Sequence, residues 1–334
     1  MRTSIGGRPR NATGLGRPRL LALLSQARPP APALVVAPAG YGKTTLLAQC
    51  AAAHPGPVAW YTADSADGAG GLVLPRLCGA VRAAAGLPPT RDEHLGRLFA
   101  DLVQATRDTV LLVIDNYEAL AGTPAEDLVE RTALAGPATL RVVVGSRRMP
   151  SLDPVRHEVA SGIALVDADA LRLRTWEVAQ LLRVVHGQPL PAEEVAELTA
   201  RTGGWPAAIQ TYLLATRDRS PAERRRAVAE LAGGSPVLRR YLDATLQAAR
   251  ADRAFLLRTS VFDVLTGARC DRLLGATGSA AVLTRLHAAG ALPLTGDGDA
   301  YRCPEVLREH LHTMLAEEFG PEAARGWHRR AGDL

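Results

Sequence analysis

Lysine is almost absent from this chain of 334 residues, in which Lys43 is the only one although lysine and arginine together number 39. Cysteine is scarce as well. The four cysteines, Cys50, Cys78, Cys270 and Cys303, are scattered and form no Cys-x-x-Cys pair. This spacing argues against a structural zinc site, and the sparse cysteine favours a reducing compartment over a disulfide scaffold.

Long apolar runs are missing too. No stretch approaches the roughly 18 uninterrupted apolar residues that a transmembrane helix needs, so we expect no membrane partner. The segment Met1–Pro18 is rich in Arg, Gly and Pro and lacks the apolar core of a secretory signal. Together with the cysteine usage, this predicts a cytoplasmic location.

The composition is that of a globular protein, with 47% hydrophobic and 22% charged residues. The length suits about two or three domains. The formal charge of +5 is carried almost wholly by arginine, with short runs at Arg224–Arg226, Arg239–Arg240 and Arg329–Arg330. Such runs could contact nucleic acid, but they are more often solvated helix faces, and we favour the second interpretation.

Apolar runs alternate with helical patterns in the amino-terminal half. Strands are predicted at a run closing with Val35–Val36, at 58–61, at 110–114 and at 140–144, and helices at 44–53, 72–85 and 95–106. This alternation predicts an α/β fold with a parallel sheet of the P-loop NTPase type, covered on both sides.

The pattern changes from about Trp176. Helices are expected at 176–186, 192–202, from Pro206 through Leu213, at 238–249, 253–259 and 280–289, with an Arg- and Ala-rich stretch at 220–235. Apolar runs near 292–294 and 301–303, parted by an Asp/Gly turn at 296–299, predict a hairpin and so a winged-helix module. We therefore divide the chain into an N-terminal arm (1–28), a P-loop nucleotide-binding domain (29–175), a helical lid domain (176–235) and a winged-helix domain (236–334).

The segment Ala37–Thr44, which reads Ala-Pro-Ala-Gly-Tyr-Gly-Lys-Thr, matches a phosphate-binding loop except at its first position, where Ala37 replaces glycine. In such a loop backbone N–H groups surround the phosphates, and glycine permits the necessary bend. Lys43 would reach the β- and γ-phosphates, and the Thr44 hydroxyl would bind magnesium. The expected cofactors are ATP or ADP with Mg²⁺. The predicted nucleotide-binding residues in this segment are Ala39, Gly40, Tyr41, Gly42, Lys43, Thr44 and Thr45.

Asp115 ends the apolar run at 110–114 and is predicted to hold magnesium through water, so that Lys43 and Asp115 form the catalytic pair. The next residue is Asn116, at a position where many P-loop hydrolases carry a carboxylate that activates water. An amide cannot accept a proton, and we expect Glu118 to point elsewhere. The sequence therefore predicts slow turnover, typical of a switch.

Other residues allow two interpretations. Arg147 and Arg148 follow the last predicted strand and could sense a γ-phosphate or cap the sheet. Asp64 and Asp67 could orient the site, but a turn is the simpler interpretation. The tryptophans at 60, 176 and 205 are expected in cores or at domain boundaries.

Taken together, several motifs resemble those of the MalT-like ATPases, which are large ATP-binding transcriptional regulators of the STAND class of signalling NTPases. The resemblance covers roughly residues 17–330. It is most specific in Gly-Tyr-Gly-Lys-Thr-Thr-Leu-Leu at 40–47 and Gly-Gly-Trp-Pro at 203–206, and it includes Trp60-Tyr61, Val113–Asp115 and Ser146-Arg147. It implies a nucleotide-binding domain, a helical domain and a winged-helix domain that close over ADP. Inducer and ATP are expected to open these domains and so permit self-association. It also implies that Pro206 packs near the adenine and that Arg147 lies at the sensor strand.

The sequence departs from that pattern in places. Asn116 replaces the usual second acid, and Pro304 stands where the family carries a histidine that contacts the bound diphosphate. The chain stops about where relatives begin a helical-repeat sensor and a helix-turn-helix, so we expect either a fragment or a short protein that serves a partner regulatory chain.

Two other functions stay open: a metabolic P-loop enzyme such as a small-molecule kinase, and a DNA-binding winged helix. Winged modules of this class mostly act as internal hinges, so we do not expect direct DNA binding from this segment.

Overall fold

The computed structural model describes residues 15–91, 94–105, 108–150, 162–187, 190–231, 236–296 and 299–333. The chain forms two units. The first consists of Met1–Ala37 and Gly42–Leu171, and the second of Pro38–Tyr41 and Arg172–Leu334. The four residues Pro38–Tyr41, from the middle of the predicted phosphate loop, thus group with the second unit.

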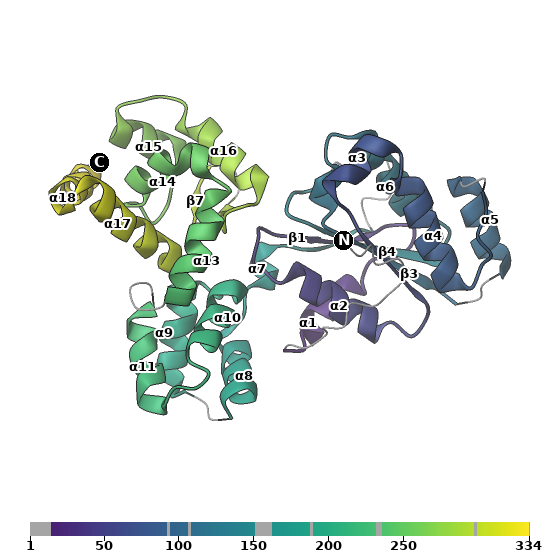
Figure 1. The fold of residues 1–334 in the computed structure, drawn as a ribbon, viewed down its shortest axis with the longest axis horizontal. Coiled ribbons are helices and arrows are strands. Elements are labelled where there is room, and N and C mark those ends of the chain that lie inside the picture. Colours follow the sequence, from purple (N-terminus) through teal and green to yellow (C-terminus); the bar gives the residue numbers. More distant parts are fainter. Residues whose placement is uncertain are drawn as a thin grey trace. The chain divides into compact units, whose positions relative to one another are not determined.

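A five-stranded sheet forms the centre of the first unit, in the order β2-β3-β4-β1-β5 (Figure 1). Every neighbouring pair in it is parallel. All six residues of β3 are buried, as expected for a strand that has a neighbour on each side and helices on each face. The order places β4 between β1 and β3. The bounds are β1 (Ala33–Val36), β2 (Val58–Thr62), β3 (Val110–Asp115), β4 (Leu140–Ser146) and β5 (Ala164–Val166).

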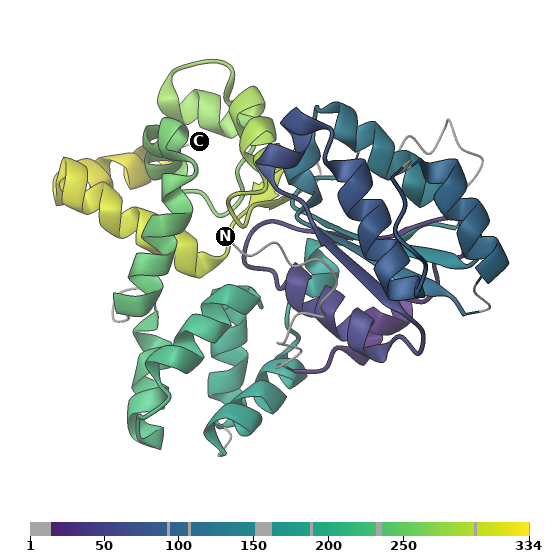
Figure 2. The same ribbon diagram turned by 45° about the vertical axis from the view of Figure 1, so that its right-hand side comes forward.

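Helices cover both faces of this sheet (Figures 1 and 2). Alternate strand residues such as Leu112 and Ile114 pack in one apolar cluster with Leu77, Leu98 and Val129 from the helices on one face, following the two-residue period of a strand. Helices α1 and α2 contact the sheet from the other face. The helical elements of this unit are α1 (Pro18–Leu24), α2 (Lys43–Ala53), α3 (Ser65–Gly70), α4 (Val73–Ala85), α5 (Leu95–Ala105), the 3₁₀ helix η1 (Tyr117–Leu120), α6 (Pro124–Ala135) and α7 (Ala168–Leu171).

The second unit is mostly helical. Proline occupies the first turn of α10 and α11, where its missing N–H would have had no partner in the helix. A short antiparallel hairpin pairs Thr295 with Arg302, and Tyr301 also bridges to Leu265. The elements are α8 (Thr175–His186), α9 (Ala192–Thr202), α10 (Pro206–Ala215), α11 (Pro221–Ala229), α13 (Pro236–Gln247), η2 (Arg250–Asp252), α14 (Arg253–Thr259), α15 (Gly267–Leu274), α16 (Ser279–Ala289), β6 (Thr295–Gly296), β7 (Tyr301–Arg302), α17 (Glu305–Phe319) and α18 (Pro321–Gly332).

The predicted fold class is confirmed: a parallel α/β sheet is followed by helices and a hairpin-bearing module. Strand β7 lies within the predicted run at 301–303, and β6 begins directly after the predicted run at 292–294. Part of their turn falls outside the described residues, as do Gly233 and Gly234. The prediction for Trp176 is wrong, because its side chain is 53% exposed on α8. The four-part division of the chain stays a prediction. Among the described residues no helix is both long and apolar enough to cross a membrane.

The buried centre of the sheet gives a stability prediction. Leu112 has no exposed surface, whereas Leu165 on the edge strand β5 is 44% exposed. Leu112→Ala should destabilise the first unit by about 2–5 kcal/mol, because it removes packed methyl groups and leaves a cavity. Leu165→Ala is the matched control and should cost less than about 1 kcal/mol. Urea unfolding followed by circular dichroism measures the stability of both variants. Equal unfolding midpoints would contradict the placement of Leu112 in the core and of Leu165 at the surface.

Candidate functional site

The predicted phosphate loop joins β1 to α2 at the carboxyl edge of the sheet. Gly40 and Gly42 have φ angles of 78° and 80°, in the left-handed region that glycine adopts readily. Gly42 is the N-cap of α2, no side chain caps that helix end in the described structure, and its first turn contains no acidic residue. The first N–H groups of a helix need partners and favour an anion. This end of α2 therefore suits a phosphate.

Lys43 is the first residue of α2, and its side chain turns back toward the loop. Its Nζ donates a hydrogen bond to the carbonyl oxygen of Ala37 at 2.7 Å. Burial lowers the pKa of Lys43 to about 8, with Arg147 acting in the same direction while Glu118 and Asp115 oppose the fall. The departure at the first loop position leaves this bond intact, because Lys43 uses the backbone of Ala37 and not its side chain.

Thr44 and Asp115 meet at the same edge. The Thr44 hydroxyl donates to Asp115 Oδ2 at 2.8 Å, and the backbone N–H of Asn116 donates to Asp115 Oδ1 at 3.0 Å. Burial raises the pKa of Asp115, and these two hydrogen bonds oppose the rise. Gly145 on β4 lies close by, and a Cβ there would stand 3.2 Å from Asp115 Oδ1.

This pair of oxygen donors fits magnesium. Mg²⁺ prefers hard oxygen ligands and is usually held by one or two protein groups together with phosphates and waters. The described residues contain no cluster of three or more His, Cys, Asp or Glu side chains that could hold a metal. A hydroxyl beside a carboxylate, next to a phosphate-binding helix end, is the donor set expected for a metal that arrives with a nucleotide.

The order of the strands brings Arg147 to this edge, because β4 lies between β1 and β3 and Val36 pairs with Ser146. Arg147 pairs with Glu118. Its backbone N–H donates to Glu118 Oε2 at 3.0 Å, and its Nε lies 3.0 Å from Oε1. The expectation that Glu118 points elsewhere is wrong, since η1 turns its carboxylate back toward the site, where it raises the pKa of Lys43.

Asn116 is held against the neighbouring strand. It has a φ of 62°, and its Nδ2 donates to the carbonyl oxygen of Ala63 at 2.9 Å. Asparagine tolerates this left-handed conformation better than most residues with side chains. The position after Asp115 therefore presents an amide whose donor is already engaged with backbone.

Asp64 and Asp67 form the start of α3. The Asp64 side chain accepts from the N–H of Ala66 at 2.8 Å, and the buried Asp67 accepts from Tyr61 Oη at 2.8 Å. The carboxylate of Asp67 also pairs with Arg76. These contacts agree with the simpler interpretation, a helix-capping turn.

Within the second unit, the loop residues Ala39 and Gly40 lie beside the Gly-Gly-Trp-Pro turn. Pro206 begins α10, and the N–H of Ala207 donates to the carbonyl oxygen of Gly40 at 3.0 Å. The Trp205 indole Nε1 donates to the carbonyl oxygen of Ala39 at 3.4 Å. Tyr41 is buried, and Thr45 is exposed in the first turn of α2. The contact of Pro206 with an adenine stays a prediction.

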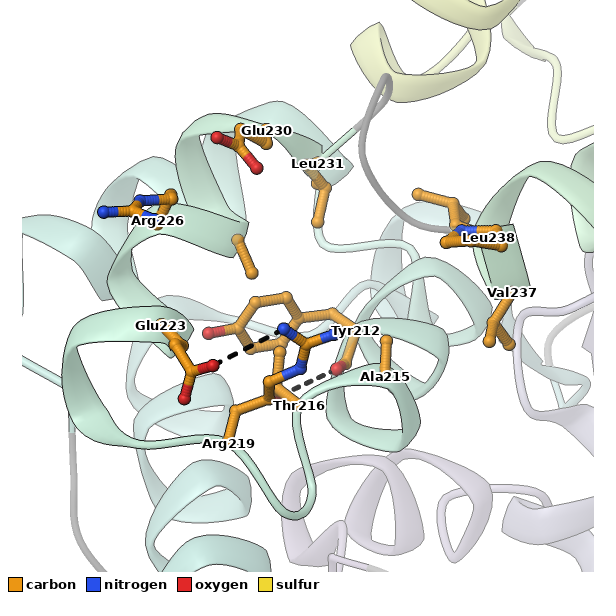
Figure 3. Close-up of a pocket in the computed structure, with 12 residues that line it drawn as sticks. Tyr212, Ala215, Thr216, Arg219, Glu223, Arg226, Glu230, Leu231, Val237 and Leu238 are labelled. Carbon is orange, nitrogen blue, oxygen red and sulfur yellow. Dashed lines mark hydrogen bonds and ion pairs between the residues drawn. The ribbon is translucent and has the colours of Figure 1, made fainter.

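A separate open cavity of about 520 Å³ lies among α10, α11 and the start of α13 (Figure 3). Tyr212, Leu231 and Leu238 are among the residues that line it. Arg219 and Glu223 stand at the rim 3.6 Å apart and pair with each other. The cavity lining mixes apolar with charged and polar side chains, and no sequence motif pointed to it.

Two family models match the chain. The model described as an AAA domain matches residues 27–147, and the model described as the MalT winged helix domain matches residues 245–323. The first match contains the loop, Asp115 and Arg147. The second contains α14 to α17 and the hairpin of the second unit.

The chain is also similar to two curated proteins over most of its length. It is 28% identical over 320 residues to the serine/threonine-protein kinase PknK of Mycobacterium tuberculosis, covering 89% of this chain and 28% of the relative. It is 29% identical over 336 residues to the HTH-type transcriptional regulator MalT of Yersinia pestis, covering 93% of this chain and 37% of the relative. The chain thus spans about a third of the length of these relatives.

Among solved structures, the Walker-type ATPase of Pyrococcus abyssi superposes with a TM-score of 0.59 at 13% identity, covering 90% of this chain and 97% of that chain. This likeness establishes the fold. The two family models and the MalT relatives show that the chain is similar to MalT-like P-loop ATPases, with an AAA domain and a MalT-type winged-helix domain.

The lowered pKa of Lys43 predicts how nucleotide binding depends on pH. Phosphates favour the charged ammonium, so binding raises this pKa and takes up a proton above the free value of about 8. Affinity for ADP should be constant between pH 7 and 7.5 and fall by up to about tenfold per unit above pH 8. Calorimetry at pH 7, 8 and 9 measures the change.

The control is Lys43→Arg, whose guanidinium stays charged across this range. Whatever its absolute affinity, that variant should show no decline between pH 8 and 9. Wild-type affinity that stays constant up to pH 9 would contradict the lowered pKa.

Proposed function

We propose that this chain is the ATP- and ADP-binding switch module of a MalT-like transcriptional regulator, in which slow ATP hydrolysis controls domain opening and self-association. The observation that carries the proposal is the group at the carboxyl edge of the sheet: an uncapped helix end, the ammonium of Lys43 and the Thr44–Asp115 pair. Ligands of α/β sheets bind at this edge. A triphosphate with magnesium supplies the negative charge and the metal that these groups suit.

The proposed roles follow from the geometry. Lys43 would exchange its bond to the Ala37 carbonyl for bonds to the β- and γ-phosphates, and Thr44 and Asp115 would hold magnesium directly and through water. The backbone of Ala39–Thr44 and the side chain of Thr45 would surround the phosphates, and Pro206 would pack near the adenine. Bound magnesium would neutralise charge on the phosphate oxygens. Arg147 would sense the γ-phosphate while its Nε keeps the ion pair with Glu118.

Slow hydrolysis is proposed because of Asn116. Its amide cannot accept a proton, and its Nδ2 is bonded to the Ala63 carbonyl oxygen. The nearest further acid with a described contact at this edge, Glu118, is paired with Arg147. A water attacking the γ-phosphate would therefore find no prepared base. A site that binds tightly and hydrolyses slowly suits a switch.

The two relatives support regulation over metabolism. By their names one is a protein kinase and the other a transcriptional regulator, and both are similar to this chain over about nine-tenths of its length. A segment shared by a protein kinase and a transcriptional regulator is best explained by a regulatory function common to both. The alternative is a metabolic P-loop enzyme such as a small-molecule kinase. In the described structure no second acid lies beside Asp115 to support it.

Nucleotide binding should depend on Lys43. Lys43→Ala removes the charge-assisted contact to the phosphates, and we expect affinity for ADP and ATP to fall at least about 100-fold. Isothermal calorimetry measures it. Arg131→Ala, on the exposed side of α6, is the control and should bind like the wild type. Unchanged affinity of the Lys43 variant would defeat the proposal.

The rate of turnover separates a switch from a kinase. With ATP and Mg²⁺ the chain should release phosphate well below about 1 per second, which is the lower end for kinases. A phosphate-release assay with and without candidate acceptor metabolites makes the measurement. Rapid, acceptor-dependent loss of ATP would favour the metabolic alternative.

A further inference from the structure

Within the second unit, the backbone of the middle of the phosphate loop, Pro38–Tyr41, is bound by residues far along the chain. The N–H of Ala39 donates to the carbonyl oxygen of Gly290 at 2.9 Å, and the N–H of Ala207 donates to the carbonyl oxygen of Gly40 at 3.0 Å. Trp205 adds its longer indole bond to the Ala39 carbonyl oxygen. Two consecutive loop residues are thus tied to three separate positions of the second unit.

Packing around Gly40 is closer than any other residue would allow. A Cβ at this position would stand 2.6 Å from Tyr241 Oη, 2.8 Å from Ala207 Cβ and 2.9 Å from Trp205 Nε1. Tyr241, on α13, also contacts Trp205, with the ring centroids 5.6 Å apart and the planes tilted by 54°. Such a tilted pair contributes stability beyond its buried area. Trp205 and Tyr241 therefore enclose Gly40 together.

The turn that carries Trp205 is itself fixed. The N–H of Leu173 donates to the carbonyl oxygen of Gly204 at 2.8 Å, and a Cβ on Gly204 would stand 2.5 Å from the Leu173 carbonyl oxygen. Trp205 has no exposed surface. A buried indole on a closely packed turn has little freedom to follow the loop, so the loop must fit the indole.

We propose that Tyr241 is a positioning residue for nucleotide binding: together with Trp205, Ala207 and Gly290, named here the loop clamp, it holds Ala39 and Gly40 in the conformation that presents the following N–H groups to phosphate. This inference rests on the proposed function. The clamp uses the Ala39 N–H and two carbonyl oxygens of the loop, and it leaves the start of α2 for the anion. Its loosening lets the tip of the loop relax and weakens the retention of the diphosphate.

Three variants test the clamp in the full chain. Tyr241→Ala removes the ring and the hydroxyl near Gly40, Tyr241→Phe removes only the hydroxyl, and Arg240→Ala is an exposed control on the same helix. Stopped-flow release of ADP that carries a fluorescent N-methylanthraniloyl group measures retention. We expect release about tenfold faster for Tyr241→Ala, comparable to the loss of one net contact. Tyr241→Phe should lie between it and the wild type, and Arg240→Ala should equal the wild type.

A double-mutant cycle separates positioning from general support of the fold. Gly40→Ala introduces the Cβ that would collide with Tyr241 Oη, so part of its effect should vanish when Tyr241 is already alanine. We expect the double variant to bind ADP at least about threefold more tightly than the product of the two single effects, which is the sign of direct coupling. A protein in which Tyr241 merely stabilises α13 would show additive effects.

The outcomes are distinct. Wild-type release from both Tyr241 variants, or additive effects in the cycle, would overturn the clamp while nucleotide binding by the wild type still upholds the proposed function. A wild-type chain that does not bind the labelled ADP would overturn both. If Tyr241→Ala fails to fold by circular dichroism, the Tyr241→Phe rate and a cycle built on Tyr241→Phe decide the question.

Discussion

The nucleotide-binding edge of this protein depends on one partly buried ammonium group. Lys43 is partly withdrawn from water, and the cost of keeping a charge there lowers its pKa to about 8. Its bond to the Ala37 carbonyl oxygen and the nearby acids Glu118 and Asp115 offset part of that cost. A site prepared in this way gains when phosphate arrives, because the anion relieves a charge that the protein alone stabilises incompletely.

The order of the strands supplies the partners for that group. Because β4 separates β1 from β3, the loop, Arg147 and Asp115 emerge side by side at one edge although they are far apart in sequence. Gly145 on β4 is part of the same arrangement. A side chain there would stand 2.6 Å from Leu47 Cδ1 and crowd Asp115, so the close approach of α2 to the sheet and the position of the acid depend on one small residue.

The sequence alone predicted those parts of the candidate site that lie on a single loop or strand. The loop could be read from its glycines and Lys43, and Asp115 from its place after a buried strand, because a turn or a strand end is determined by its own neighbours. Strand order and the return of Glu118 through η1 could not be read, since both depend on how elements pack. Trp176 was misjudged for the same reason: an aromatic residue is usually buried, and only tertiary structure shows that this one is exposed.

The loop clamp also depends on tertiary packing and could not be predicted from local sequence. It explains why the two glycines of the loop have different structural roles. Gly42 bends the backbone at the start of α2 and has open space around it, whereas Gly40 combines a similar bend with close contacts to Trp205 and Tyr241. The spacing of the motif shows the first duty but not the second, because Tyr241 lies about 200 residues further along the chain. A loop that must fit both an anion and an aromatic pair can respond to either one. That double constraint links the conformation of the loop both to a bound anion and to the aromatic pair.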